Sequence, residues 1–495
     1  MAAMQYIQEA LATVLTPELL VLVVVVSLIG ILLGATPGIG PTLALVLFFP
    51  FTFVLEAEVG LSLMAVLYGS TTFGGSVSAI LVNIPGTPGS AATLLDGYPL
   101  TKQGKAALAL GAATLSSFIG AVIGLIFLAL FAPLLADFSL AFGPADFFML
   151  AVFGLSIISA VTRGSLLKSL VAVSLGVLFA SVGTDPIRAS PRYVFDTFYL
   201  QGGVDLVVLL VGLFAVSQAI EMTLSTDSTA QMAISDTSVW HGVREAVNDW
   251  TGMLRGGLIG TIVGSIPGVG ISAANFLSYL VAVRFSKSPE TFGTGNPKGV
   301  VAAESANNGS AMGALVPAMA LAIPGGASAA VFIGVMVTYG ISPGPQAFEA
   351  TSLPYVIYIS ILLGNLVFLA GGLLGGKYFA RVNELSDDVL LAAIISFALM
   401  GAYAVRTNIL DVVVAVLIGL FAFGLERRGY SLVAFIMGFI LAPIAERGFQ
   451  RALLISGGDY GIFVESPISA ILLILSLVMF LSPIALRLRS DGEGA

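Results

Sequence analysis

Two short motifs decide the architecture of this chain, and each of them occurs twice. The first reads Gly34-Ala-Thr-Pro-Gly-Ile-Gly40 and returns as Gly264-Ser-Ile-Pro-Gly-Val-Gly270. The second reads Ile84-Pro-Gly-Thr87 and returns as Ile323-Pro-Gly-Gly326. All four lie inside apolar stretches, where helix-breaking Pro and Gly are tolerated only if the freed backbone faces protein or a water-filled cavity. Corresponding breaks in two halves of a membrane protein indicate a transporter binding site.

The composition predicts an all-α polytopic membrane protein. Of the 495 residues, 57% are hydrophobic and 10% are charged, and the mean hydropathy is +1.03. Apolar runs long enough to cross a bilayer recur along the chain and predict roughly 12 to 14 spans, the number depending on how the broken segments are scored. The N-terminus up to Pro17 lacks Lys and Arg. The first span is therefore expected to belong to the mature fold rather than to a cleaved signal.

Composition and motifs also exclude several function classes. The chain has no Cys and a formal net charge of −8, which rules out disulfides and Cys-based metal sites and argues against nucleic-acid binding. An enzyme is not expected, because the apolar segments offer neither a base beside a nucleophile nor a set of His or carboxylate metal ligands. No Gly-x-x-x-x-Gly-Lys-Ser/Thr loop is present, so ATP would have to be hydrolysed by another chain.

A polar stretch over residues 221–250 divides the chain near its middle. Residues 1–220 (half one) and 251–495 (half two) each carry both motifs in the same order, which predicts an internal duplication joined by a linker.

Loop charges predict that the two halves are inverted repeats. After the first motif, half one is acidic and half two is basic, and after the second motif the pattern reverses; the basic residues are Arg284, Lys287 and Lys298 in half two and Lys102 and Lys105 in half one. Basic loops are enriched in the cytoplasm, so corresponding loops are expected on opposite sides. The linker and the C-terminus are then cytoplasmic and the N-terminus is external. Five arginines are exceptions to this charge rule, because the assignment places them on the external side of the membrane: Arg188, Arg192, Arg406, Arg447 and Arg451.

The breaks supply chemistry for an anion and for a cation. A helix that begins inside the membrane presents backbone N–H groups that suit a carboxylate, and one that ends there presents carbonyls that suit Na⁺. The expected substrate residues are Pro37, Gly38, Gly40, Pro85, Gly86, Thr87, Pro267, Gly268, Gly270, Pro324, Gly325, Gly326 and Ser328. The expected Na⁺ residues are Ser76, Ser78, Asn83, Asn307, Asn308 and Ser310. For any single Ser or Thr, packing between helices is the alternative.

Ionisable residues are scarce inside the apolar segments, and this favours Na⁺ over a proton as the coupling ion. The candidates for carrying a proton are Asp96 and Glu304, each at the polar edge of a broken segment. The alternative for both is a role as an interfacial cap or loop contact.

Longer blocks surround the motifs. They include Asn83-Ile-Pro-Gly-Thr-Pro-Gly-Ser90, Asp96-Gly-Tyr-Pro99, Glu304-Ser-Ala-Asn-Asn308, Ile323-Pro-Gly-Gly326 and Gly344-Pro345. From about Gly30 to about Gly461, the chain resembles the large membrane subunit, of TctA type, of the tripartite tricarboxylate transporters. One block departs from the family pattern, because Ala303 stands where a Pro is expected before Glu304.

The resemblance implies a secondary transporter of the bacterial inner membrane that imports a carboxylate by an elevator-like movement. It also implies two partners, a small four-helix membrane subunit and a periplasmic substrate-binding protein. Family members differ in cargo, and nothing in the sequence selects among tricarboxylates, dicarboxylates and aromatic acids. The alternatives to a Na⁺-coupled importer are a proton-coupled organic-anion carrier and a passive channel or scaffold subunit, since broken helices also line pores.

Overall fold

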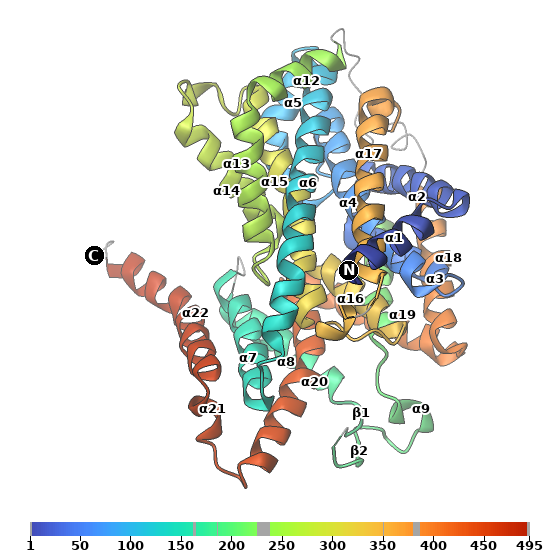
Figure 1. Cartoon of the computed structure of the whole chain (residues 1–495), viewed down its shortest axis with the longest axis vertical. Coiled ribbons are helices and arrows are strands. Elements are labelled where there is room, and N and C mark those ends of the chain that lie inside the picture. Colours follow the sequence, from blue (N-terminus) through green and yellow to red (C-terminus); the bar gives the residue numbers. More distant parts are fainter. Residues whose placement is uncertain are drawn as a thin grey trace.

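The computed structural model describes residues 2–161, 165–185, 187–224, 238–349, 351–379 and 387–492 and is almost wholly helical (Figure 1). The described residues include eight helices that are long and apolar enough to cross a membrane and six shorter apolar helices. The prediction of an all-α polytopic membrane protein is confirmed. Residues 225–237 of the predicted linker lie outside the described residues.

Half one begins with the helices that its two motifs interrupt and continues with further helices and one short strand pair. Its elements are α1 (Ala2–Val14), α2 (Pro17–Ala35), α3 (Pro41–Thr52), α4 (Ala57–Val82), the 3₁₀ turn η1 (Pro88–Ala91), α5 (Leu94–Lys102), α6 (Ala106–Ser139), α7 (Pro144–Val161), α8 (Leu166–Ala180), the antiparallel strands β1 (Gly183–Thr184) and β2 (Pro191–Arg192), α9 (Phe198–Gln201), α10 (Leu206–Leu210), the π-helical turn η2 (Val211–Val216) and α11 (Ser217–Leu224).

The linker and half two follow a similar order. Their elements are α12 (Val239–Asn248), α13 (Trp250–Gly264), α14 (Gly270–Phe285), η3 (Pro289–Thr291), α15 (Pro297–Leu321), α16 (Ala327–Thr338), η4 (Pro345–Ala347), α17 (Leu353–Phe379), α18 (Asp387–Arg406), α19 (Ile409–Arg427), α20 (Leu432–Ile455), α21 (Ile462–Glu465) and α22 (Pro467–Gly492).

All four motifs interrupt helices. The first motif separates α2 from α3 and α13 from α14, and the second follows α4 and α15. The latter two helices end in the same way, since Asn83 (φ 62°) and Ala322 (φ 57°) are both left-handed and each stands two residues before the Pro of its Ile-Pro-Gly sequence. A non-Gly residue in this conformation is uncommon, so its use at two corresponding positions indicates that the two breaks share one backbone path.

The helices before the second breaks, α4 and α15, are almost entirely buried and run antiparallel to each other. Asn308 Nδ2 donates to the Gly69 carbonyl oxygen (3.0 Å), and Asn307 Nδ2 donates to that of Thr72 (3.3 Å). Residue numbers therefore rise along one helix as they fall along the other.

Glycines allow the same close helix contact in each half. A Cβ on Gly34 of α2 would lie 2.1 Å from the Thr71 carbonyl oxygen of α4, and a Cβ on Gly264 of α13 would lie 2.4 Å from that of Ser310 of α15. Small residues of this kind let two helix backbones touch within a membrane.

Loops that follow different motifs meet across the halves. Gln103 Nε2, after the second motif of half one, donates to the Thr294 carbonyl oxygen (2.8 Å), after the first motif of half two. At the other pairing, Ser352 Oγ donates to Glu58 (2.9 Å). Each first-motif loop thus lies beside the second-motif loop of the opposite half.

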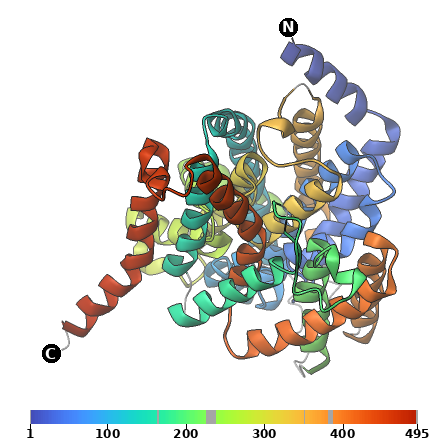
Figure 2. The same cartoon turned by 90° about the horizontal axis from the view of Figure 1, so that it is seen from below.

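A second group of helices packs beside these broken segments. α20 contacts α7 and α8, and α22 contacts α7 (Figure 1). Gly438 of α20 packs on Val173 of α8, and Gly212 of η2 packs on Ala415 of α19 in a similar manner. Figure 2 shows α1 and α22 projecting away from the rest of the chain in different directions.

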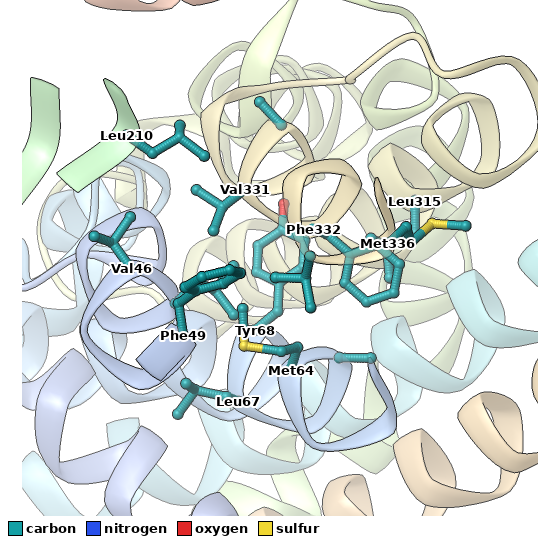
Figure 3. Close-up of a cluster of buried hydrophobic side chains, with 14 of the residues drawn as sticks. Val46, Phe49, Met64, Leu67, Tyr68, Leu210, Leu315, Val331, Phe332 and Met336 are labelled. Carbon is teal, nitrogen blue, oxygen red and sulfur yellow. The ribbon is translucent and has the colours of Figure 1, made fainter. Parts of the chain in front are cut away.

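The hydrophobic core joins the two halves. Helices α3 and α4 of half one pack against α15 and α16 of half two, through Val46, Phe49, Met64, Leu67, Leu315, Val331, Phe332 and Met336 (Figure 3). Tyr68 lies among these side chains and brings a hydroxyl into their midst.

Candidate binding site between the two halves

The four breaks converge on one cavity of about 480 Å³. Residues next to every break line it, together with residues of α4, α15 and the start of α20. The polar side chains are those of Thr42, Tyr68, Thr72, Thr87, Ser272, Asn307, Ser328 and Ser431. Among the described residues that line it, none is Asp, Glu, Lys, Arg or His.

Four helices begin at this cavity. α3, α14 and α16 start at the lining residues Pro41, Gly270 and Ala327, and α20 starts after its N-cap Ser431. The first turn of a helix has N–H groups without intrahelical partners, and the helix dipole adds about half a positive charge there. Helix starts of this kind favour an anion over a cation, even where no charged side chain is present.

The cavity is lined by corresponding residues of the two halves. Pro267 follows Pro37 by 230 residues and Pro324 follows Pro85 by 239. Counted in this way, the matched lining residues are Pro41 and Ile271, Thr42 and Ser272, Tyr68 and Asn307, Thr87 and Gly326, Pro88 and Ala327, and Gly89 and Ser328.

Hydrogen bonds hold the breaks of one half against the helices of the other. Thr42 and Ser328 share a hydrogen bond of 3.0 Å. Ser272 Oγ donates to the Pro88 carbonyl oxygen (2.8 Å), and Asn275 Nδ2 donates to that of Gly89 (2.7 Å). Within the loop itself, Thr87 and Ser90 cap each other in a reciprocal capping box. The site is thus built from both halves at once.

The predicted substrate residues separate into two sets. Those that line the cavity are Thr87, Gly268, Gly270, Gly325, Gly326 and Ser328. Those that are not part of its lining are Pro37, Gly38, Gly40, Pro85, Gly86, Pro267 and Pro324. Gly86 is a packing residue in the structure, because a Cβ there would lie 2.2 Å from the Gly34 carbonyl oxygen.

Two of the six predicted Na⁺ residues lie together. Asn307 Nδ2 is 3.4 Å from Ser76 Oγ. Ser78 and Ser310 donate within their own helices, to Gly75 and Asn307. Asn308 is buried, and its Nδ2 donates to the Gly69 carbonyl oxygen of α4.

Asn83 is exposed at the end of α4, and none of the hydrogen bonds of the described residues joins it to Ser76 or Asn307. Its left-handed backbone, rather than a ligand contact, is what the structure shows at this position.

Glu304 is not at a polar edge, and its interpretation as an interfacial cap is wrong. The residue is fully buried inside α15 and accepts hydrogen bonds from Ser76 Oγ (2.6 Å), Ser117 Oγ (2.7 Å) and Thr93 Oγ1. The sequence is misleading here because neighbouring helices, rather than lipid, surround α15. Polar residues in this helix therefore do not mark the point where it leaves the membrane.

Asp96 makes a loop contact, which is the role expected for it if it does not carry a proton. Its Oδ1 accepts the backbone N–H groups of Gly293, Gly295 and Asn296 at 2.8–2.9 Å, and its Oδ2 accepts the Tyr279 hydroxyl at 2.8 Å. This carboxylate, which is also fully buried, fastens the loop before α15 to half one.

Sequence reasoning missed Thr42, Tyr68, Ser272 and Ser431 as lining residues. Ser431 follows Gly429 (φ 77°) and accepts the Ala434 N–H, so a helix-capping signal was present. Nothing in the sequence indicates that this helix start reaches the cavity, because α20 belongs to the second group of helices.

Comparison with known proteins gives consistent matches. The family model of the tripartite tricarboxylate transporter TctA family matches residues 20–437. The chain is 34% identical over 492 residues to an uncharacterized 52.8 kDa protein in the TAR-I ttuC′ 3′ region of Agrobacterium vitis, covering 97% of this chain and 96% of that protein. It is also 34% identical over 235 residues to an uncharacterized protein in the TAR-II ttuC′ 3′ region of the same organism, covering 47% of this chain and 97% of that protein. No solved structure matches.

Proposed function

The chain belongs to the tripartite tricarboxylate transporter TctA family, and from this premise we propose that it imports a carboxylate through the cavity between its two halves, coupled to Na⁺. The observation that carries the proposal is the junction of four helix starts at a cavity lined only by uncharged described residues. Helix N-termini and hydroxyl donors bind carboxylates, and discontinuous helices do so in known transporters.

The neutral lining suits a carrier that must release its cargo. A Lys or Arg partner in a buried site would hold a carboxylate strongly, because charges attract strongly away from water. Backbone N–H groups together with Thr42, Ser272 and Ser328 give weaker, multiple hydrogen bonds. The cavity volume of about 480 Å³ fits a small organic acid, since ligand sites of 300–1,000 Å³ are usual.

Na⁺ is the proposed coupling ion because an organic anion needs its charge balanced to cross a hydrocarbon core. Oxygen atoms, the ligands that hard cations prefer, gather behind the cavity at Ser76, Glu304 and Thr93. A proton-coupled carrier is the second candidate, and the buried carboxyl of Glu304 is the observation that favours it.

Inverted repeats and an elevator-like movement are parts of the same proposal. The antiparallel course of α4 and α15, and the meeting of unlike loops at Gln103–Thr294 and Ser352–Glu58, support the inversion. One wall of the cavity, formed by Ser431, Val433 and Ala434, comes from α20, which packs with α7 and α8. We infer that the broken helices carry the site along this wall.

The proposal also covers the membrane, the orientation and the partner proteins of the chain. It places the chain in a bacterial inner membrane with the N-terminus outside, the linker and C-terminus in the cytoplasm, and a small four-helix subunit and a periplasmic substrate-binding protein as partners. The exposed apolar side chains of α22, such as Ile474 and Val478, suit contact with lipid or with a membrane subunit.

Counterflow tests the function directly. The chain and its two partners are reconstituted in proteoliposomes that contain an unlabelled carboxylate, and uptake of a radiolabelled one is followed over a panel of mono-, di- and tricarboxylates. A carrier gives a transient accumulation driven by internal substrate, with or without a Na⁺ gradient. Equilibration without accumulation for every acid that enters would contradict the proposal and support a channel.

A matched pair of glycine variants ties this activity to the cavity. A Cβ meets nothing within 4 Å at Gly326, which lines the cavity, or at Gly424 of α19. Gly326→Leu is expected to fill the cavity and abolish counterflow, whereas Gly424→Leu retains it. Equal activity of the two variants would place the site elsewhere.

A further inference from the structure

We propose that Glu304 is the anionic ligand of the coupling Na⁺, with the hydroxyl oxygens of Ser76, Thr93 and Ser117 as the other side-chain ligands. This inference rests on the proposed function and names the cation site within it. Four separate parts of the fold supply these residues, because Ser76 lies on α4, Thr93 just before α5, Ser117 on α6 and Glu304 on α15.

Glu304 is a fully buried carboxyl, and no cationic partner for it lies among the described residues. None of the ion pairs among the described residues includes it, and its exposed fraction is 0%. Burying an ionised carboxylate without a partner is costly in free energy, so buried charges are normally paired or coordinate a metal ion.

The hydrogen-bond donors around Glu304 are hydroxyl groups. Ser76 Oγ and Ser117 Oγ reach one carboxyl oxygen at 2.6 and 2.7 Å, and Thr93 Oγ1 reaches the other. A hydroxyl can donate its proton or present a lone pair. The same hydroxyls that solvate the carboxylate in this arrangement can therefore rotate and ligate a hard cation placed among them.

Other carboxylates buried to a similar extent are held differently. Asp96 accepts three backbone N–H groups, Asp185 accepts those of Ile187 and Arg188, and Asp411 is paired with Arg406. An N–H group cannot turn a lone pair towards a cation. Asp96 and Asp411 each accept one tyrosine hydroxyl as well, and the buried Asp146 accepts the Ser469 hydroxyl beside the Gly143 N–H group. Glu304 thus differs from these four in accepting three Ser and Thr hydroxyls, each of which can become a ligand.

Glu304 lies directly behind the proposed substrate cavity. Asn307, one helical turn further along α15, lines the cavity, and its Nδ2 lies 3.4 Å from Ser76 Oγ, which donates to Glu304. A carboxylate substrate in the cavity meets a like charge nearby unless a cation neutralises Glu304. Na⁺ and substrate are therefore expected to increase each other's affinity, and by the same factor.

The test uses the purified full-length chain without substrate. Its thermal unfolding midpoint is measured over a NaCl titration, with choline chloride keeping the ionic strength constant. Two adjacent buried serines on α6 provide a matched pair: Ser117 Oγ donates to Glu304, whereas Ser116 Oγ has no hydrogen-bond partner among the described residues.

The wild type and Ser116→Ala are expected to be stabilised by Na⁺ with the same half-saturating concentration. Ser117→Ala should need about tenfold more Na⁺, the change expected from one lost ligand. Glu304→Gln should unfold cooperatively in choline but not respond to Na⁺. If Glu304→Gln does not fold, the Ser117 and Ser116 pair decides the question.

The inference is overturned if the wild type does not respond to Na⁺, or if Ser117→Ala or Glu304→Gln titrates like the wild type. If the wild type still performs carboxylate counterflow in that case, the proposed transport function stands and only the assignment of the cation site is lost.

Discussion

The equivalent helices α4 and α15 follow the same backbone path but carry different chemistry. Both are buried, both end in a left-handed residue and both precede an Ile-Pro-Gly break. α15 carries Glu304, Asn307 and Asn308, whereas the corresponding positions of α4, 239 residues earlier, are Ala65, Tyr68 and Gly69. The buried polar side chains of α4 are hydroxyls such as that of Ser76, which donates to Glu304.

This difference shows which parts of a duplicated site must repeat. Backbone contacts require Gly and Pro, so both halves keep them at the breaks. The cavity and the cation site each receive side chains from both helices, so those side chains need to complement each other rather than match. One helix supplies the carboxyl and amides, and the other supplies the hydroxyls.

The largest effect on stability is expected at the close glycine contact that occurs once within each half. Gly34→Val and Gly264→Val each place a branched side chain against a helix backbone, since even a Cβ would lie 2.1 and 2.4 Å from a carbonyl oxygen. We expect each to lose at least about 3 kcal/mol of stability, the upper range for overpacked cores, and to yield little monodisperse protein in size-exclusion chromatography.

Gly326→Ala is the control for this pair, because its Cβ meets nothing within 4 Å. If only one of the Val variants fails to fold, the two halves do not depend on the same contact and the comparison is broken.

The next largest effect is expected at Asp96, an anchor that half two lacks, since Val335 stands at the corresponding position. Asp96→Ala leaves the N–H groups of Gly293, Gly295 and Asn296 without their acceptor. A loss of about 3 kcal/mol is expected, because unsatisfied buried donors cost roughly 1–3 kcal/mol each and the loop can relax partly into water.

Asp96→Asn keeps an oxygen acceptor and is expected to recover most of that loss. The thermal unfolding midpoints of the two variants check this. Equal destabilisation by Ala and Asn would mean that the negative charge, not the acceptor geometry, is what stabilises the loop.

Two helix caps, one in each half, sharpen the comparison at the cavity. Ser431 caps α20 and Asp205 caps α10, each through a backbone N–H, but only Ser431 lines the cavity. Ser431→Asp keeps a cap while placing a carboxylate beside the substrate. Substrate affinity is expected to fall at least about tenfold through like-charge repulsion, with the folded yield unchanged.

The reverse exchange, Asp205→Ser, also keeps a cap and should leave the affinity for substrate as it is. The concentration dependence of counterflow measures both variants. An unaltered affinity in Ser431→Asp would remove α20 from the site.

The smallest effect is expected at Thr42, whose hydroxyl bonds Ser328 across the halves at 3.0 Å. Thr42→Val preserves the shape and removes one hydrogen-bonding group, so a loss of about 0.5–1.5 kcal/mol in substrate binding is expected, or a few-fold in affinity. Ser272→Ala, the corresponding change in half two, should lose a similar amount. A loss confined to one of them would show that the substrate contacts only one half.

The sequence was sufficient for the repeated breaks and for the membrane class, because Pro, Gly and apolar runs act locally on the backbone. It indicated Thr87, Gly326 and Ser328 at the cavity for the same reason. It was insufficient for Glu304 and Ser431. Their roles depend on how α15 and α20 pack against other helices, and a residue-by-residue pattern does not contain that information.

The most direct test of the central claim uses the absence of native Cys. Thr42→Cys and Ser272→Cys introduce thiols at corresponding cavity positions of the two halves, and Thr294→Cys introduces one in an exposed loop. The rate at which a small thiol reagent modifies each Cys is measured in Na⁺ buffer. The measurement is repeated at increasing concentrations of a carboxylate that the protein exchanges in the counterflow assay.

The account predicts that the carboxylate protects both cavity thiols with the same half-maximal concentration and leaves the loop thiol unprotected. Protection of one cavity position alone, or of neither, would contradict a substrate site formed jointly by the two halves.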